Sequence, residues 1–84
     1  MKLIARNLPR TFTEDELRQL FQPFGKIKSC DLVMDENTGQ TKGFGFIEMP
    51  RMVEAQAAIK DLNKKNVLGK SIRVKTTRSV HSKH

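Results

Sequence analysis

Apolar and polar residues alternate in four short segments of the chain, and a period of two is typical of strands with one buried face. The segments are residues 2–6, 27–34, 42–49 and 71–75. In each segment one set of alternate side chains is mainly apolar or glycine, and we expect that set to face the core. The inward set is Leu3, Ala5, Cys30, Leu32, Gly43, Gly45, Ile47, Met49, Ile72 and Val74.

Two segments between these strands have the spacing of amphipathic helices instead. In the first, "FTEDELRQLFQPFG", Thr13 and Glu16 match a capping box, and Pro23 with Gly25 is expected to end the helix. Its apolar stripe is Leu17, Leu20, Phe21 and Phe24. The second helix is predicted over residues 51–63, with a stripe made of Ala55, Ala58, Ile59 and Leu62.

The predicted order is βαββαβ, with a polar hairpin loop over residues 35–40 and a turn over residues 64–70. This order predicts an α+β fold of the ferredoxin-like kind, an open-faced sandwich in which both helices cover one face of a four-stranded antiparallel sheet. We expect residues 1–76 to form this domain and residues 77–84 to be a basic, disordered tail. Gly43 and Gly45 would lie under the helices, where the backbone can approach a helix closely.

The opposite face of the sheet is left bare by this arrangement, and the segment "KGFGFIEM" places two phenylalanines on it. Lys42, Phe44, Phe46 and Glu48 share that face because side chains alternate along a strand. A chain of 84 residues buries only roughly 60% of the surface that it exposes when unfolded. Leaving two Phe side chains exposed therefore removes two large apolar residues from a small hydrophobic core. We therefore expect a ligand to cover them.

The net charge of +7 is unevenly distributed along the chain. Residues 1–61 hold as many acidic as basic groups, and no carboxylate side chain follows Asp61. This asymmetry favours a polyanionic partner near the C-terminal end. Lys2, Arg6, Lys42, Arg73 and Lys75 all project to the predicted face of the two rings or border it. Aromatic rings flanked by cations on an uncovered sheet suit single-stranded nucleic acid, since bases stack on the rings and cations hold phosphates.

The same residues resemble a known family. "KGFGFIEM" is similar to the octapeptide signature of the RNA recognition motif at every position except the last, and "LIARNL", residues 3–8, resembles the companion hexapeptide. The resemblance covers about residues 2–76, and the short chain also looks like the small stand-alone bacterial members of the family.

The resemblance implies roles for individual residues. Phe44 matches the ring that sits against the sugars or between bases, and Phe46 matches the ring that stacks a base. Lys42 matches a phosphate contact, while Arg73 and Lys75 match positions that add contacts to base edges or to the backbone.

Two positions depart from the family pattern. Ile4 stands where the hexapeptide usually has Phe or Tyr, so one of three stacking platforms is missing. Met49 replaces an aromatic residue, but its parity points it into the core. We therefore predict binding of modest affinity and broad specificity, in which the basic C-terminal segment, including Arg78, supplies a larger electrostatic share.

Three further residues complete the predicted interface. Asp31 and Glu48 either are ordinary surface residues or accept hydrogen bonds from base amino groups, and Val33 adds apolar surface. An alternative function remains open, since Ile4, Val33, Phe44 and Phe46 could dock a peptide or a second copy of the chain. Single-stranded DNA is a further possible ligand, because stacking does not require a 2′-hydroxyl group.

Other function classes find little support in the sequence. His81 and His84 lie in the predicted tail, and no nucleophile, general base or metal-ligand cluster is evident, so we expect no enzymatic activity, no cofactor, no metal and no small-molecule substrate. No apolar run approaches the length of a membrane span. A single cysteine fits a reducing compartment. We expect a cytoplasmic protein that is monomeric when free.

Overall fold

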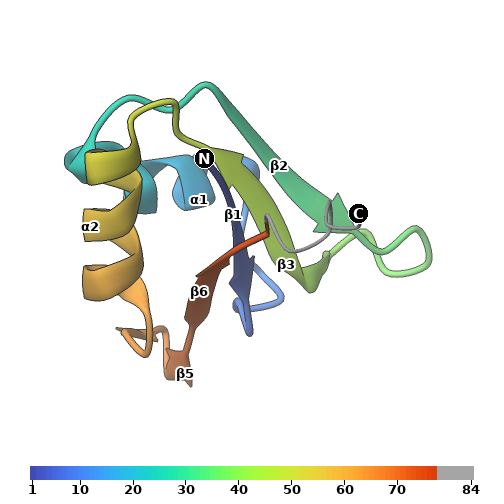
Figure 1. The fold of residues 1–84 in the computed structure, drawn as a ribbon. Coiled ribbons are helices and arrows are strands. Elements are labelled where there is room, and N and C mark those ends of the chain that lie inside the picture. Colours follow the sequence, from blue (N-terminus) through green and yellow to red (C-terminus); the bar gives the residue numbers. More distant parts are fainter. Residues whose placement is uncertain (78–84) are drawn as a thin grey trace.

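Four strands form one antiparallel sheet, and both helices pack on the same side of it (Figure 1). The computed structural model describes residues 1–77. The strand order across the sheet is β2-β3-β1-β6. The four strands are β1 (Lys2–Arg6), β2 (Ser29–Met34), β3 (Thr41–Glu48) and β6 (Arg73–Thr76). This architecture confirms the predicted ferredoxin-like open-faced sandwich.

The first helix, α1 (Glu14–Phe21), begins at the predicted capping box. The Thr13 hydroxyl accepts a hydrogen bond from the Glu16 backbone N–H at 3.2 Å, and the Glu16 carboxylate accepts one from the Thr13 N–H at 2.9 Å. These two bonds satisfy donors that the first turn of a helix would otherwise leave free. The helix ends in a short 3-10 turn, η1 (Gln22–Phe24), which contains the proline predicted to stop it.

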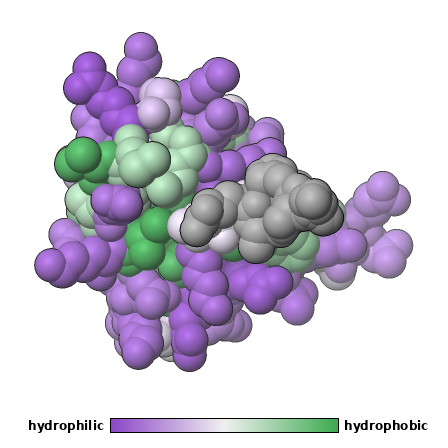
Figure 2. Space-filling model, in the orientation of Figure 1, coloured by the Kyte–Doolittle hydropathy of each residue, from purple (hydrophilic) through white to green (hydrophobic). Residues whose placement is uncertain are grey.

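The second helix, α2 (Met52–Leu62), packs on the sheet through two alanines and a leucine. Ala55, Ala58 and Leu62 are buried, whereas Met52 and Val53 on its outer side are 60% and 78% exposed. Figure 2 shows hydrophobic residues gathered over this part of the molecule, within a surface that is otherwise mostly hydrophilic. Within residues 1–77, neither helix has the length and apolar character needed to cross a membrane.

The segment between α2 and β6 differs from the prediction of a simple turn. It contains a second, two-stranded sheet formed by β4 (Asn66–Val67) and β5 (Lys70–Ser71). Ser71 pairs with Asn66 in this hairpin, so the last strand of the main sheet begins at Arg73 rather than at Ser71. The predicted inward direction of the segment is correct, because Ile72 and Val74 are both buried.

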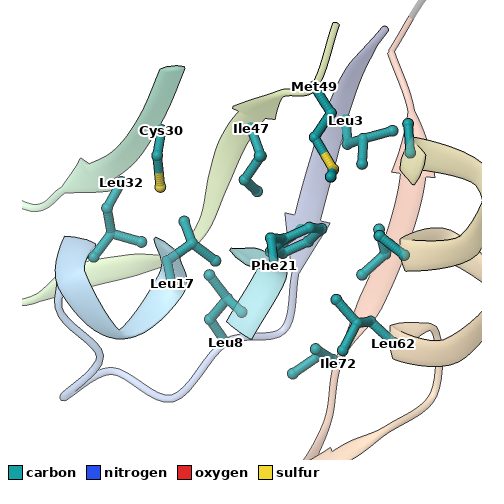
Figure 3. Packing of buried hydrophobic residues seen from close by; sticks show 14 of the residues in the cluster. Leu3, Leu8, Leu17, Phe21, Cys30, Leu32, Ile47, Met49, Leu62 and Ile72 are labelled. Atoms are coloured by element: carbon teal, nitrogen blue, oxygen red, sulfur yellow. The ribbon is translucent and has the colours of Figure 1, made fainter. Parts of the chain in front are cut away.

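The core lies between the sheet and the helices, with the Phe21 ring near its centre (Figure 3). All eight predicted inward side chains of the strands are buried: Leu3, Ala5, Cys30, Leu32, Ile47, Met49, Ile72 and Val74. Leu20, Phe24 and Ile59 are only partly buried, so the helical stripes are narrower than predicted. Burial disfavours the charged thiolate and raises the pKa of Cys30 to about 11.

Two glycines of β3 lie on the covered side for different reasons. A Cβ atom on Gly45 would lie 2.7 Å from the Asp31 carbonyl oxygen and 2.9 Å from Leu17 Cδ2, so glycine lets α1 approach the sheet, as predicted. Gly43 instead has a φ of 96° and only the Leu8 carbonyl oxygen nearby, at 3.5 Å. Its role is therefore the backbone conformation, and the predicted close approach to a helix is wrong at this position.

Candidate nucleic-acid interface

The pairing of the strands arranges seven of the predicted interface residues in two rows across the bare face of the sheet. The first row consists of Asp31, Phe46, Ile4 and Lys75. The second consists of Phe44, Arg6 and Arg73. Positions two residues apart along a strand are about 7 Å apart. Side chains distant in the sequence are thus brought into a patch that could contact several consecutive nucleotides.

The two phenylalanine rings are half-buried neighbours within this patch. Their centroids are 6.2 Å apart and their planes meet at 89°. Because the rings are perpendicular, one flat base cannot stack on both of them. Each ring must therefore offer its own contact, with a base face on one ring and a sugar or a second base against the other.

Lys2 already contacts one of these rings. Its Nζ atom lies 5.6 Å from the centroid of Phe46. A cation over an exposed ring contributes about 0.5–1 kcal/mol, whereas a stacked base contributes about 1–3 kcal/mol. A base can therefore displace the ammonium group from the ring, which leaves Lys2 beside the base and free to bind a phosphate.

The predicted cations surround the rings at the surface. Arg6, Lys42, Arg73 and Lys75 are all exposed, and Ile4 is half-buried between its neighbours Phe46 and Lys75. Ile4 therefore occupies the centre of the patch, where it contributes an aliphatic surface and no ring.

The two predicted carboxylates differ in their partners. Glu48 lies 4.0 Å from the Lys28 ammonium group, which is the one ion pair found within residues 1–77. Asp31 is exposed beside Phe46 and has no such partner within the same range. Asp31 is thus the freer of the two to accept a hydrogen bond from a base amino group.

Val33 lies where the pairing of β2 with β3 is interrupted by an irregularity between Leu32 and Met34. The buried Thr41 hydroxyl donates to the Val33 carbonyl oxygen at 2.9 Å, which holds this irregular segment against β3. The Val33 side chain is half-buried and keeps its predicted outward direction. It extends the apolar part of the patch toward the edge of the sheet.

Sequence reasoning missed two cations at one end of the sheet. Arg10, in the loop after β1, and Lys70, in β5, line a cleft together with Arg6, Lys42 and Phe44. Arg10 lies outside every predicted strand and helix, so no periodicity predicts where its side chain lies. Lys70 was assigned to a turn, which does not predict the direction of a side chain. Only the folded arrangement shows that Arg10 and Lys70 line the same cleft as Phe44.

Some predictions cannot be placed. Arg78 and most of the predicted tail, residues 78–84, lie outside the described residues. Within residues 1–77, no group of three or more His, Cys, Asp or Glu side chains is arranged to hold a metal ion.

A model of a protein family matches nearly the whole described chain. The model described as the RNA recognition motif matches residues 3–73. The chain belongs to the RNA recognition motif family. RNA recognition motifs are generally binding domains rather than enzymes, and their characteristic aromatic residues lie on the sheet face described above.

Individual relatives agree with this assignment. The chain is 41% identical to RNA-binding protein BRN2 of Arabidopsis thaliana over 76 residues. These aligned residues make up 90% of this chain and 18% of that protein. It is 35% identical to the RNA recognition domains 1 and 2 of Sex-lethal from Drosophila melanogaster, with a TM-score of 0.86 over 92% of this chain and 49% of that one. RNA binding protein PG1 is 33% identical, with a TM-score of 0.83 over 89% of this chain and 90% of that one. The chain thus spans less than a fifth of the curated relative and about half of the Sex-lethal fragment.

Proposed function

We propose that this chain binds single-stranded RNA on the bare face of its sheet, by stacking bases on Phe44 and Phe46 and holding phosphates with the surrounding cations. The perpendicular pair of rings, half exposed among cations, carries this proposal. Two observations on relatives support it. BRN2 is described as an RNA-binding protein, and Sex-lethal, at 35% identity, has been solved in a complex with RNA.

Binding is expected to be of modest affinity and broad specificity. Stacked bases contribute about 1–3 kcal/mol each regardless of their identity, because every base has an aromatic face. Most of the remaining contacts are cations that meet phosphates, which carry no sequence information. Asp31 is the residue placed best to add some preference, since a carboxylate accepts hydrogen bonds from base amino groups.

The test is a titration with a pool of random single-stranded RNA. The variant Phe44→Ala/Phe46→Ala removes both rings and is expected to weaken binding by about 2–6 kcal/mol, which is roughly 30-fold to more than 10,000-fold in Kd. The control is Met52→Ala/Val53→Ala, which truncates two exposed apolar side chains on the helical side of the molecule. Thermal unfolding of both variants checks that they remain folded.

Equal binding by the wild type and the ring variant would overturn the proposal. The alternative function, docking of a peptide or of a second copy of the chain, would then use the same apolar surface. Ile4 favours this alternative to some extent, because an aliphatic residue at the centre of the patch contacts protein as readily as RNA. We propose a monomeric state for the free chain, which size-exclusion chromatography can check.

Further predictions from the sequence remain proposals. They include binding of single-stranded DNA, a cytoplasmic location, action by binding without catalysis, and resemblance to small stand-alone bacterial members. The curated relative described above is a plant protein and lends no support to the bacterial resemblance.

A further inference from the structure

A cleft of about 410 Å³ is lined by residues from the end of β1, the loop after it, the start of β3 and β5. These segments meet at the lower end of the sheet in Figure 1. Four of the residues that line the cleft are the cations Arg6, Arg10, Lys42 and Lys70. Phe44, one of the two phenylalanines of the sheet face, also lines the cleft. The volume lies within the range of small-ligand pockets, so the cleft has room for a nucleotide unit.

Hydrogen bonds hold the two outlying cations against the end of the sheet. The backbone N–H of Leu8 donates to the Gly43 carbonyl oxygen at 2.8 Å, which attaches the loop carrying Arg10 to β3. The side-chain amide of Asn7 donates to the Ser71 carbonyl oxygen at 2.8 Å, which attaches β5 to the end of β1. Hydrogen bonds therefore join the segments that form the cleft. One of these bonds links Asn7 to Ser71, which are 64 positions apart in the sequence.

The charge in the cleft is not compensated by the described part of the chain. The lining contains no carboxylate, and the one ion pair within residues 1–77 joins Lys28 to Glu48, neither of which lines the cleft. Cations that line a concave surface focus a positive potential and raise the local concentration of anions. The cleft thus favours an anionic ligand.

We propose that this cleft binds the sugar-phosphate backbone of a single RNA strand where the strand leaves Phe44, with Arg10 and Lys70 contacting phosphates. The proposal rests on the RNA-binding function proposed above and extends the interface beyond the sheet face. Phe44 links the two surfaces, because a nucleotide on its ring places the adjoining phosphate at the entrance of the cleft. RNA fits this combination of ring and cations better than an acidic peptide does, since a base can stack on the ring.

The experiment measures the Kd for a single-stranded RNA oligonucleotide at several salt concentrations. Each phosphate contact on a single strand changes the slope of log K against log salt by about 0.7. The variant Arg10→Gln/Lys70→Gln should therefore flatten the slope by about 1.4 and weaken binding several-fold for RNAs of different sequence. Both side chains are exposed, so the variant should unfold at the same temperature as the wild type.

A matched control separates this effect from a general loss of charge. Lys26→Gln/Lys60→Gln removes two exposed cations away from the sheet face and should keep the slope of the wild type. If the two variants have the same slope, the cleft does not bind phosphate and the proposal is wrong. Direct binding of a polyglutamate peptide that is lost in the cleft variant, without any change in the RNA slope of that variant, would instead assign the cleft to an acidic protein segment.

The ring variant distinguishes this proposal from the one on which it rests. Phe44→Ala/Phe46→Ala should lower affinity but keep the salt slope, because the rings carry no charge. If the ring variant binds as well as the wild type while the cleft variant flattens the slope, stacking fails and the phosphate cleft stands.

Discussion

Ile4 is the residue that most limits the interface. It lies in the middle of the sheet face, paired with Phe46 on one side and Lys75 on the other. Directly opposite residues on neighbouring antiparallel strands have Cβ atoms about 4.5–5.5 Å apart, so a side chain at this position reaches both neighbours. An aromatic ring here would be a third stacking platform beside the two phenylalanines. An isoleucine offers only van der Waals contact.

Replacing this residue tests that reasoning. Ile4→Tyr should tighten binding of a short single-stranded RNA by about 1–3 kcal/mol, or roughly 5- to 150-fold in Kd, because it adds one stacked base. Fluorescence anisotropy titration measures the change. Ile4→Val serves as the control, since it alters the side chain at the same site without adding a ring. If the tyrosine variant binds no more tightly than the valine variant, the idea of a missing platform is wrong.

At the scale of single residues, the sequence was enough for most of the sheet face. Every second residue of β3 belongs to this face, namely Lys42, Phe44, Phe46 and Glu48. Side chains alternate along a strand, so these four lie on the bare face once the helices are known to cover the other face. The sequence could not show that the rings are perpendicular or that Lys2 lies over one of them. Those relations depend on side-chain rotamers, which alternation does not determine.

At the scale of elements, the hairpin formed by β4 and β5 was not predicted. Its turn consists of Leu68 and Gly69, with φ angles of 51° and 86°. Two positive φ angles in a two-residue hairpin are typical of a type I′ turn, for which Asn-Gly is the preferred sequence. A leucine at the first of these positions is unfavourable. Because leucine is not typical of this turn type, the hairpin could not be predicted from its turn residues. The main strands and helices were predicted, because each of them buries one face. Burial of one face requires apolar residues at a period of two in a strand and of about 3.6 in a helix.

The unfavourable turn residue gives a stability prediction. Leu68→Asn should raise the free energy of unfolding by about 1 kcal/mol, because asparagine tolerates the left-handed conformation that costs other residues about 1–2 kcal/mol. Such a gain corresponds to a rise in Tm of about 4–8 °C for a domain of this size. The Leu68 side chain is 73% exposed, so little packing is lost.

The control for this prediction is Leu68→Ala, which removes the same side chain but keeps the unfavourable conformation. Chemical denaturation in urea compares the three proteins. Equal stability of the asparagine and alanine variants would show that the turn is not strained. Affinity for RNA should stay unchanged in the asparagine variant, because Lys70 keeps its position in the hairpin.

At the scale of the whole molecule, the two sides of the sheet have opposite characters. The helical side buries the core and exposes apolar residues such as Met52 and Val53. The bare side has two rings surrounded by cations that form no ion pair within residues 1–77, namely Lys2, Arg6, Lys42, Arg73 and Lys75. The charge excess near the C-terminal end therefore contributes to the same face through Arg73 and Lys75, in addition to the cleft residue Lys70. The linear charge pattern predicted a polyanion, but only the strand order β2-β3-β1-β6 places these cations beside the rings.

This arrangement predicts a steep dependence of binding on salt. If three to five of the sheet-face cations Lys2, Arg6, Lys42, Arg73 and Lys75 contact phosphates, they should contribute a slope of about −2 to −3.5 to the fall of log K with log salt. These contacts alone should weaken the affinity of the wild type for single-stranded RNA roughly 20- to 130-fold between about 50 mM and 200 mM salt, and the two phosphate contacts proposed for the cleft should add a further change of about sevenfold. Docking of an apolar peptide on the same face should hardly change, because hydrophobic contacts are not screened. A change of less than about threefold would therefore contradict RNA binding through these cations and favour the protein-docking alternative. Measuring DNA of the same sequence alongside RNA shows whether the 2′-hydroxyl contributes, since stacking and phosphate contacts alone would give equal affinities.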